Sequence, residues 1–368
     1  MARKGENIYK RKDGRWEGRY VKGCYEDGRA KYAYVYAHSY QETRRLLGEA
    51  KIKQALGESI VGRSPKIAEI ANEWLEINRH KVSESTFVKY SAVIKKHIIS
   101  ELGALRAECV TEGHICTFTD TLLCEKQLAP KTVRDILTIL GSILKYARHK
   151  NGAKMPSAEI IYPKYNRKEM RVLSVAEQRR LFEFLTTDTD RRKLGIMLAL
   201  ITGMRIGELC ALRWGDISFE DRCVRVRATM QRLLDADSGV TRVVISSPKT
   251  ENSARIIPLT EFALGLCEHF RAEDKRAFVL TGDAERFCEP RVMQYHFDKI
   301  TQDLGLLGVH FHSLRHTFAT RCVEVGFEIK SLSEILGHAS PKITLERYVH
   351  SSIELKRDNM QKLCALGF

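Results

Sequence analysis

Residues that could carry out phosphoryl transfer gather near the C-terminal end of this sequence. His312, Arg315, His316 and Tyr348 lie in one short segment, and Arg205 lies upstream in the sequence T-G-M-R-I-G-E-L. Two guanidinium groups can neutralise one phosphate, and a tyrosine hydroxyl can attack it. This combination predicts that the chain breaks and rejoins a phosphodiester bond.

A phosphodiester exchange without a metal has three chemical requirements. Negative charge grows on the non-bridging oxygens, and a forked guanidinium holds them better than an ammonium does. One group must accept the proton of the nucleophile, and another must protonate the leaving 5′ oxygen. A tyrosine has an ordinary pKa of about 10, so it needs strongly positive surroundings to react as a phenolate.

The spacing of these residues predicts shared helical faces. His312 and Arg315 are three apart and His316 is four from His312, so a helix would place them together. Arg205 and Glu208 are also three apart, where a helix is expected to begin, and a buried Glu208 could hold the guanidinium.

Two other residues near these motifs have open interpretations. Lys249 lies between two strand candidates, and we expect it at a hairpin tip that could enter a DNA groove and donate a proton; such a lysine is usually only solvated. We interpret His316 as a helix-packing residue in preference to a phosphate contact. Trp214 and Leu212 are expected in the core.

Length and charge limit the class of protein. The chain has 368 residues, enough for two or three domains, and a net charge of +15. A small-metabolite enzyme has no need of this excess, whereas a polyanion binder does. The ten cysteines form no C-x-x-C pair, which indicates small buried residues in a reducing compartment. Without a long apolar run we expect a soluble, intracellular protein with no membrane contact.

The pattern divides the chain into three predicted domains, at 1–63, 64–160 and 170–368, and predicts a multidomain fold that is mainly α with small β-sheets. Residues 1–63 hold 15 basic and 8 acidic residues. Alternating strands and a capping box at Ser39 predict a three-stranded sheet with one helix, and Tyr32, Tyr34 and Tyr36 share one face. This basic and aromatic face could enter a DNA groove; the alternative is a solvated basic surface over a packed aromatic face. Its candidate DNA contacts are Arg15, Arg19, Lys31 and Tyr34.

Residues 64–160 have helical periodicity throughout. Helices are expected to start near Ser83 and at Pro130, because proline suits the first helical turn. The polar faces are basic, and such faces are most often only solvated. The sharper alternative is a DNA clamp, whose candidate contacts are Lys89, Lys96, Lys131 and Arg134.

Residues 170–368 are predicted to form an α+β domain. A capping box, Ser174 to Glu177, opens its first helix, and strand candidates lie at 223–228, 243–246 and 254–258. No phosphate-cradling glycine loop and no carboxylate cluster occur in the sequence, so we expect neither ATP nor a metal as cofactor.

Together these motifs resemble the tyrosine recombinases, also called phage integrases. The resemblance rests on T-G-M-R-I-G-E-L at Arg205, P-K-T at Lys249, H-S-L-R-H-T-F-A-T at Arg315, L-G-H at His338 and R-Y-V-H at Tyr348. His338 and Tyr348 lie one residue further apart than in many members. The first two domains resemble the arm-binding and core-binding domains of the integrases of conjugative transposons and temperate phages.

The resemblance implies a role for each matched residue. Tyr348 would form a 3′-phosphotyrosyl link, Arg205 and Arg315 would clamp the scissile phosphate, and Lys249 would be the general acid. His312 would assist proton transfer and His338 would bond the phosphate. A further residue, Glu208, would orient the segment around Arg205.

The implied function is site-specific recombination that integrates and excises a mobile element. Its implied partners are double-stranded DNA with core-type and arm-type sites, three further protomers at synapsis, and an excisionase and DNA-bending proteins. The implied location is the bacterial cytoplasm, at the nucleoid. An amphipathic tail, 352–368, is expected to pack on a neighbouring subunit or on its own domain. The alternatives are a type IB topoisomerase-like enzyme and a catalytically inert DNA-binding regulator.

Overall fold

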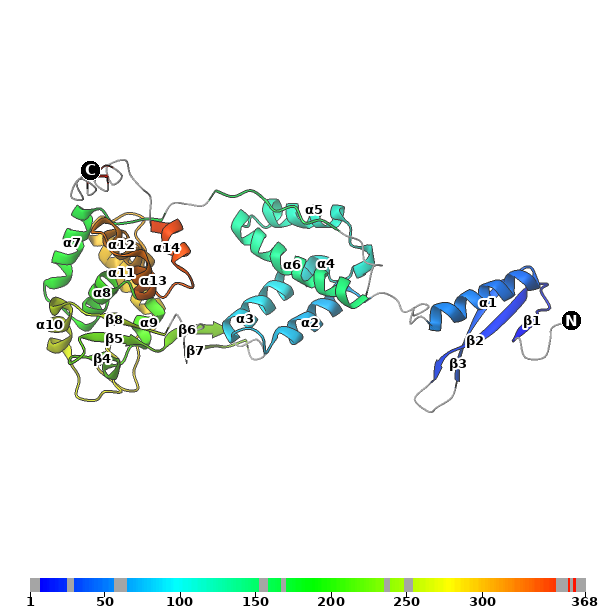
Figure 1. Ribbon diagram of the computed structural model, residues 1–368, viewed down its shortest axis with the longest axis horizontal. Coiled ribbons are helices and arrows are strands. Elements are labelled where there is room, and N and C mark those ends of the chain that lie inside the picture. Colours follow the sequence, from blue (N-terminus) through cyan, green and yellow to red (C-terminus); the bar gives the residue numbers. More distant parts are fainter. Residues whose placement is uncertain are drawn as a thin grey trace.

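The computed structural model describes residues 7–24, 30–55, 65–151, 158–166, 170–234, 239–247, 254–348, 357 and 360–361. These residues form an N-terminal, a helical and a C-terminal unit, which follow one another in chain order along the long axis (Figure 1). Each unit has a hydrophobic core of its own. The residues at which one domain gives way to the next stay a prediction.

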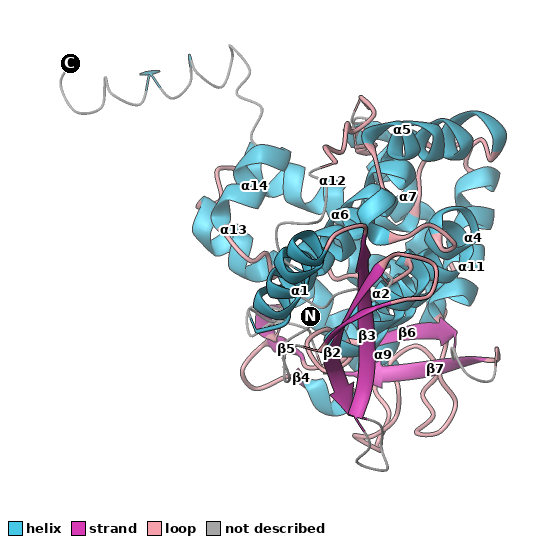
Figure 2. Cartoon of the chain, turned by 90° about the vertical axis from the view of Figure 1, so that its right-hand side faces the viewer, coloured by secondary structure: helices cyan, strands magenta, loops and turns pink. Residues whose placement is uncertain are grey.

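The N-terminal unit is a small sheet covered by one helix (Figure 2). Its elements are β1 (Ile8–Lys10), β2 (Trp16–Cys24), β3 (Ala30–Ala37) and α1 (Tyr40–Ala55). The strands are antiparallel in the order β1-β2-β3. Helix α1 begins at Tyr40 because the Ser39 hydroxyl accepts a hydrogen bond from the Glu42 amide at 3.2 Å. The predicted sheet and helix are confirmed.

The two faces of this sheet differ as the alternation along the strands predicts. Tyr20 and Val35 pack toward α1. On the opposite face Tyr32, Tyr34 and Tyr36 are 44%, 48% and 45% exposed. The predicted common face of the three tyrosines is confirmed, and the alternative in which this aromatic face is packed is wrong.

The helical unit contains the elements α2 (Ile67–Asn78), α3 (Glu84–Val93), η1 (Ile94–Ile99), α4 (Ser100–Leu102), η2 (Ala107–Cys109), α5 (Glu112–Asp120), η3 (Thr121–Glu125) and α6 (Pro130–Asn151). Helices α3 and α6 begin after Ser83 and at Pro130, as predicted. The cysteine prediction is wrong in this unit, since Cys109, Cys116 and Cys124 are exposed, whereas the described cysteines of the C-terminal unit are buried.

The C-terminal unit surrounds the largest core and joins helices to two small sheets. Its elements are α7 (Val175–Thr186), α8 (Arg191–Thr202), α9 (Ile206–Ala211), η5 (Trp214–Asp216), β4 (Ile217–Ser218), β5 (Cys223–Val226), β6 (Thr229–Leu234), β7 (Thr241–Ser246), β8 (Arg255–Pro258), α10 (Glu261–Phe270), α11 (Pro290–Asp303), α12 (Phe311–Glu324), α13 (Ile329–Leu336) and α14 (Pro341–Tyr348). Both amide contacts of the Ser174–Glu177 capping box are present, and Leu212 and Trp214 are buried as predicted.

The predicted hairpin around Lys249 is wrong. Strand β7 pairs with β6, and β8 pairs with β5 in a different sheet of order β4-β5-β8. The segment between β7 and β8 therefore connects two sheets. The predicted strands could not show this connection, because they did not include β6, the strand that pairs with β7.

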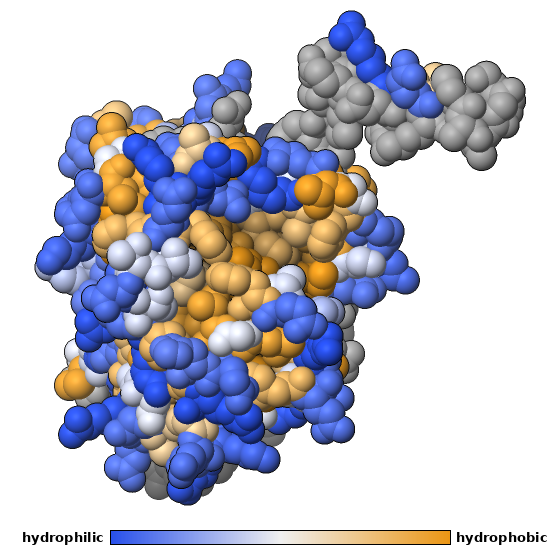
Figure 3. Space-filling model, turned by 90° about the vertical axis from the view of Figure 1, so that its left-hand side faces the viewer, coloured by the Kyte–Doolittle hydropathy of each residue, from blue (hydrophilic) through white to orange (hydrophobic). Residues whose placement is uncertain are grey.

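The outer side of the C-terminal unit, where α7 and α10 lie, shows an apolar area framed by polar side chains (Figure 3). A shallow hollow of about 560 Å³ on α10 includes Phe262, Leu266 and Phe270 among its lining residues. Among the described residues, none of the helices combines the length and apolar composition needed to cross a bilayer.

Candidate active site

The two predicted arginines are held by the ends of two helices. The last carbonyl groups of a helix have no partner within it and carry partial negative charge. Arg315 on α12 is 2% exposed and donates to the carbonyl oxygens of Gly203 (2.8 Å), after α8, and Leu336 (2.6 Å), in α13. Arg205 donates from Nη2 to the carbonyl oxygen of Gly337 at 3.1 Å. Both guanidinium planes are thus oriented by protein backbone.

Glycine is required where both helices end. Gly203 and Gly337 cap α8 and α13 with φ of +66° and +64°, in the left-handed region that favours glycine. A Cβ atom at Gly203 would lie 2.5 Å from Cδ1 of Phe318. The glycines of T-G-M-R and L-G-H therefore place two carbonyl acceptors against the arginines.

Glu208 is a buried carboxylate shared by two guanidinium groups. Arg205 donates to Oε1 at 2.7 Å from its side chain and to Oε2 at 2.9 Å from its amide. Arg255 of β8 donates to the same two oxygens at 2.9 and 2.8 Å. Burial alone raises the pKa of Glu208, but hydrogen bonds and charge from Arg255, with the charge of Arg205, lower that pKa to about 2. The predicted pairing of Glu208 with Arg205 is confirmed.

Tyr348, at the end of α14, is surrounded by histidines and is 5% exposed. Nδ1 of His316 lies 2.8 Å from the Tyr348 hydroxyl oxygen. The ring of His338 is parallel to the phenol at a centroid distance of 6.2 Å, while its own Nδ1 bonds the Thr344 hydroxyl at 2.8 Å. His312 lies edge to face with His316, at 4.5 Å between ring centroids. The predicted common face of His312, Arg315 and His316 on α12 is present.

The charges in this cluster act against one another. Burial and the charges of Arg205 and Arg255 lower the pKa of Arg315 to about 9. Burial and the charges of Arg315 and Arg205 lower the pKa of His338 to about 3 and the pKa of His312 to about 4. These positive groups repel one another, which makes their protonated forms less favourable. An anion bound among them would offset this repulsion. The cluster therefore suits a phosphate.

The phenol of Tyr348 is influenced by opposing effects. Burial raises its pKa, and the positive charges of Arg315 and Arg347 act to lower it. In this environment the hydroxyl is protonated at neutral pH, so attack on phosphorus requires a group that takes its proton.

The candidate DNA contacts of the N-terminal unit lie along the open face of the sheet. The Arg19 guanidinium stacks on Tyr32 at 4.5 Å from the ring centroid, and Arg19 lies opposite Tyr34 across β2 and β3. Arg15 stacks on Tyr36 at 5.8 Å and pairs with the carboxylate of Asp13. Lys31 belongs to β3, but its side chain lies outside the described residues.

Three of the four candidate DNA contacts of the helical unit have partners within the protein. Lys89 and Lys131 both pair with the carboxylate of Asp135. Arg134 donates to the carbonyl oxygen of Pro163 at 3.0 Å and stacks on Tyr162 of the same segment. Lys96 is exposed on η1. A role for these four in DNA binding stays a prediction.

Lys249 lies outside the described residues, as does most of the predicted tail at 352–368. Two residues of the cluster were missed or undervalued from sequence. His316 contacts the phenol, although it had been assigned to packing; its spacing of four from His312 was the available signal. Arg255 gave only a weak signal, a charged residue within the apolar strand pattern A-R-I-I-P.

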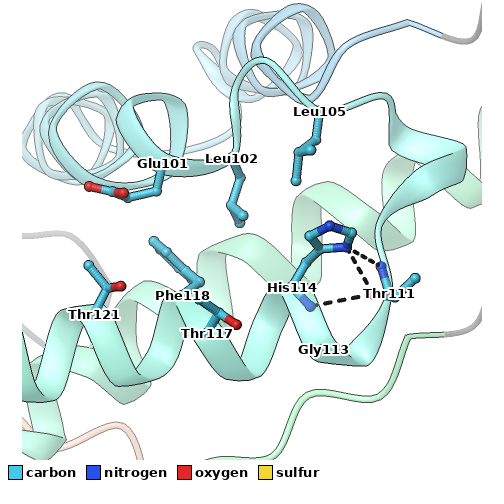
Figure 4. Close-up of a pocket in the computed structure, with 9 residues that line it drawn as sticks. All are labelled: Glu101, Leu102, Leu105, Thr111, Gly113, His114, Thr117, Phe118 and Thr121. Carbon is cyan, nitrogen blue, oxygen red and sulfur yellow. Dashed lines mark hydrogen bonds between the residues drawn. The ribbon is translucent and has the colours of Figure 1, made fainter.

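A hollow of about 530 Å³ in the helical unit belongs to a different region (Figure 4). It lies between α4 and α5, and its lining residues are Glu101, Leu102, Leu105, Thr111, Gly113, His114, Thr117, Phe118 and Thr121. The Thr111 hydroxyl and the His114 ring bond each other at 2.8 Å as the cap of α5. This hollow contains none of the predicted catalytic residues.

Comparison with protein families identifies the class of this protein. Residues 171–354, half of the chain, match the phage integrase family, and residues 66–123 match the N-terminal SAM-like domain of phage integrases. The chain therefore belongs to the phage integrase family. It is a tyrosine recombinase, an enzyme class that cleaves and rejoins DNA strands.

Individual relatives agree with this assignment. The chain is 26% identical over 324 residues to a XerC-like tyrosine recombinase of Caldanaerobacter subterraneus subsp. tengcongensis, covering 81% of this chain and 82% of the relative. It is 25% identical over 284 residues to the ICEBs1 integrase of Bacillus subtilis, covering 74% and 75%. The Tn1549 transposon integrase, solved in complex with transposon right end DNA, shares its fold with a TM-score of 0.68 at 21% identity, covering 81% of this chain and 99% of that one.

Proposed function

We propose that this chain is a site-specific DNA integrase that cuts and rejoins DNA through a 3′-phosphotyrosyl intermediate and thereby integrates and excises a mobile element. The observation that carries the proposal is the cluster formed by Arg205, Arg315, three histidines and Tyr348 around the ends of α8 and α13. The positive groups of this cluster repel one another and are therefore suited to bind one phosphate. Tyr348 supplies one nucleophile.

In the proposed reaction the Tyr348 oxygen attacks the scissile phosphorus. A bond forms between the phenol oxygen and phosphorus, and the bond from phosphorus to the 5′ oxygen breaks. Arg205 and Arg315 hold the non-bridging oxygens, since oriented guanidinium groups stabilise the charge that develops there. Glu208 keeps the guanidinium of Arg205 in place through its paired hydrogen bonds.

Proton transfer completes the step. Lys249 is proposed to give its proton to the leaving 5′ oxygen, and His312 to assist proton transfer by accepting the proton that the Tyr348 phenol loses, while His338 donates a hydrogen bond to the phosphate. The covalent link conserves the energy of the broken phosphodiester, so rejoining is the reverse reaction with a new 5′ hydroxyl as nucleophile. This chemistry itself consumes no ATP.

The proposed substrate is double-stranded DNA in two kinds of site. The helical and C-terminal units would bind core sites, and the exposed tyrosines and arginines of the N-terminal sheet would bind arm sites. The Tn1549 integrase, with the same fold, binds the right end of its transposon. Exchange between two duplexes cleaves four strands, which calls for four protomers at synapsis. Accessory proteins that bend DNA, an excisionase, and action at the bacterial nucleoid belong to the same proposal.

A nicked substrate that loses a short 5′ fragment on cleavage tests the proposal, because the trapped enzyme cannot rejoin the strand. The wild-type chain should form a protein–DNA adduct that survives denaturation. Tyr348→Phe should bind the same DNA with unchanged affinity and form no adduct. An inert DNA-binding regulator predicts no adduct with either protein.

The topoisomerase alternative is tested separately with supercoiled plasmid. An integrase acts on plasmids that carry its paired sites, whereas a topoisomerase relaxes any supercoiled plasmid. Efficient relaxation of a plasmid without sites would contradict the proposal. The family relationships do not favour either alternative.

A further inference from the structure

One of the three histidines near the nucleophile has a contact that the proposed reaction does not use. Nδ1 of His316 lies 2.8 Å from the Tyr348 hydroxyl, whereas Nδ1 of His338 is taken by Thr344. His312 meets the ring edge of His316. We propose that His316 is a positioning residue, which fixes the Tyr348 oxygen for attack by accepting a hydrogen bond from it. This inference rests on the proposed function of Tyr348.

The direction of the hydrogen bond follows from the charge state of the ring. Burial, with positive charge from His312, Arg315 and Arg347, lowers the pKa of His316 to about 4. The imidazole is therefore neutral at pH 7, and with its hydrogen on Nε2 it presents a lone pair at Nδ1. The phenol is protonated in the same surroundings, so it is the donor.

His316 is well placed to act as a fixed reference point. It is 8% exposed, and the ring of His312, one turn earlier on α12, packs against it edge to face. Arg315, its neighbour in the chain, belongs to the proposed phosphate clamp. One helix thus carries both a holder of the phosphate and a holder of the nucleophile, and their separation is set by rigid backbone.

Tyr348 needs such a holder because its hydroxyl must be kept in one place for attack. It lies on α14, whose described part is Pro341–Tyr348, and a short helix is held in place mainly by its tertiary contacts. In-line attack requires the reacting atoms to be about 3 Å apart and aligned, and small misplacements are costly in rate. A buried hydroxyl also needs hydrogen-bond partners. Arg315 can only donate to the Tyr348 oxygen, so His316 is placed to accept the hydroxyl proton.

Single-turnover cleavage of the nicked substrate tests the inference. His316→Ala should cleave roughly 10- to 100-fold more slowly than wild type at saturating DNA, with unchanged DNA affinity. His316→Asn should recover most of the rate, because the Asn side-chain oxygen stands at about the position of Nδ1 and accepts a hydrogen bond without acting as a base. His269→Ala, which changes an exposed histidine on α10, serves as the control and should cleave normally.

A better leaving group separates positioning from acid catalysis. A substrate with sulfur in place of the bridging 5′ oxygen expels a thiolate, which needs no protonation at pH 7 as an alkoxide does. This substrate should restore cleavage to Lys249→Ala, the variant of the proposed general acid. It should leave His316→Ala slow, since a better leaving group does not move the nucleophile.

Three outcomes would overturn the inference: wild-type cleavage by His316→Ala, equal rates for the Ala and Asn variants, or rescue of the Ala variant by the sulfur substrate. If His316→Ala does not fold, the ¹⁵N resonance of His316 Nδ1 decides the question. It should shift in DNA-free Tyr348→Phe, and an unchanged resonance would refute the hydrogen bond. If wild type forms no adduct at all, the proposed function fails instead.

Discussion

The cluster at α12–α14 and the open face of the N-terminal sheet both present arginines beside aromatic rings, yet they hold them differently. In the cluster, Arg315 is 2% exposed and both of its terminal nitrogens donate to backbone carbonyls. On the sheet, Arg15 and Arg19 stack on tyrosines that are nearly half exposed.

This difference separates catalysis from attachment. A guanidinium fixed by backbone cannot reorient at little cost, which suits a charge that must be met at one place in a transition state. Arginines stacked on an exposed sheet can adjust to a phosphate backbone, and their contribution is screened by salt. We therefore expect substitutions in the cluster to change the cleavage rate, and substitutions on the sheet to change the affinity for DNA.

The largest effect is expected for Arg315→Lys. An ammonium cannot reach two carbonyls and a phosphate in one plane, so single-turnover cleavage should fall by roughly 100- to 1,000-fold. Core-site affinity, measured by gel shift, should change little. Arg225→Lys, an arginine of β5 paired with Asp221, is the matched control. A near-normal cleavage rate for Arg315→Lys would remove the distinction between the two regions.

Glu208→Gln should destabilise the C-terminal unit. The substitution leaves Arg205 and the buried Arg255 without their shared counter-charge, and breaking a buried pair costs roughly 3–5 kcal/mol. Amide hydrogen exchange in α9 and α12 should accelerate, while exchange in the N-terminal sheet stays unchanged. Unaltered protection in α9 would show that Glu208 does not hold this site together.

Acid should weaken the same unit in a defined range of pH. The folded pKa of Glu208, about 2, lies below the ordinary value of 4.5, so its ionised form stabilises the fold above pH 4.5. The difference amounts to roughly 3 kcal/mol, which is lost progressively as the pH falls from 4.5 toward 2. The wild-type protein should lose this stability over that range and Glu208→Gln should not. Parallel pH profiles of hydrogen exchange in α9 would argue against the assignment.

A smaller effect is expected on the N-terminal sheet. Arg19→Ala removes one cation next to Tyr32 and Tyr34, so arm-site affinity should fall and the slope of its logarithm against salt should decrease by about one. Cleavage of a core-site substrate should proceed at the wild-type rate. A salt slope equal to that of the wild type would mean that this face does not contact phosphates.

The sequence predicts contacts within one helix better than contacts between elements. The pairing of Arg205 with Glu208 and the shared face of His312 and Arg315 follow from spacings of three and four residues. The second partner of Glu208, Arg255, lies on a strand far along the chain, and no local period indicates it. The contact of His316 with the phenol depends in the same way on how α14 packs against α12.

The prediction of strand pairing was limited for the same reason, since paired strands can lie far apart in the sequence. The alternation of Tyr32, Tyr34 and Tyr36 gave the exposed face of the first sheet correctly. The strand pattern around Lys249 predicts a hairpin, but β7 pairs with β6, a strand that contacts α9 and was not among the predicted strands. The partners of surface lysines could not be predicted either, because only the packing of α3 beside α6 brings Lys89 to Asp135.

The most direct test of the central claim is to identify the amino acid that becomes linked to DNA. The wild-type adduct with the nicked substrate would be digested with trypsin and nuclease, and the modified peptide sequenced by mass spectrometry. We predict a single phosphorylated residue, Tyr348, attached to a 3′ nucleotide. Attachment at any other residue, or to a 5′ nucleotide, would contradict the account.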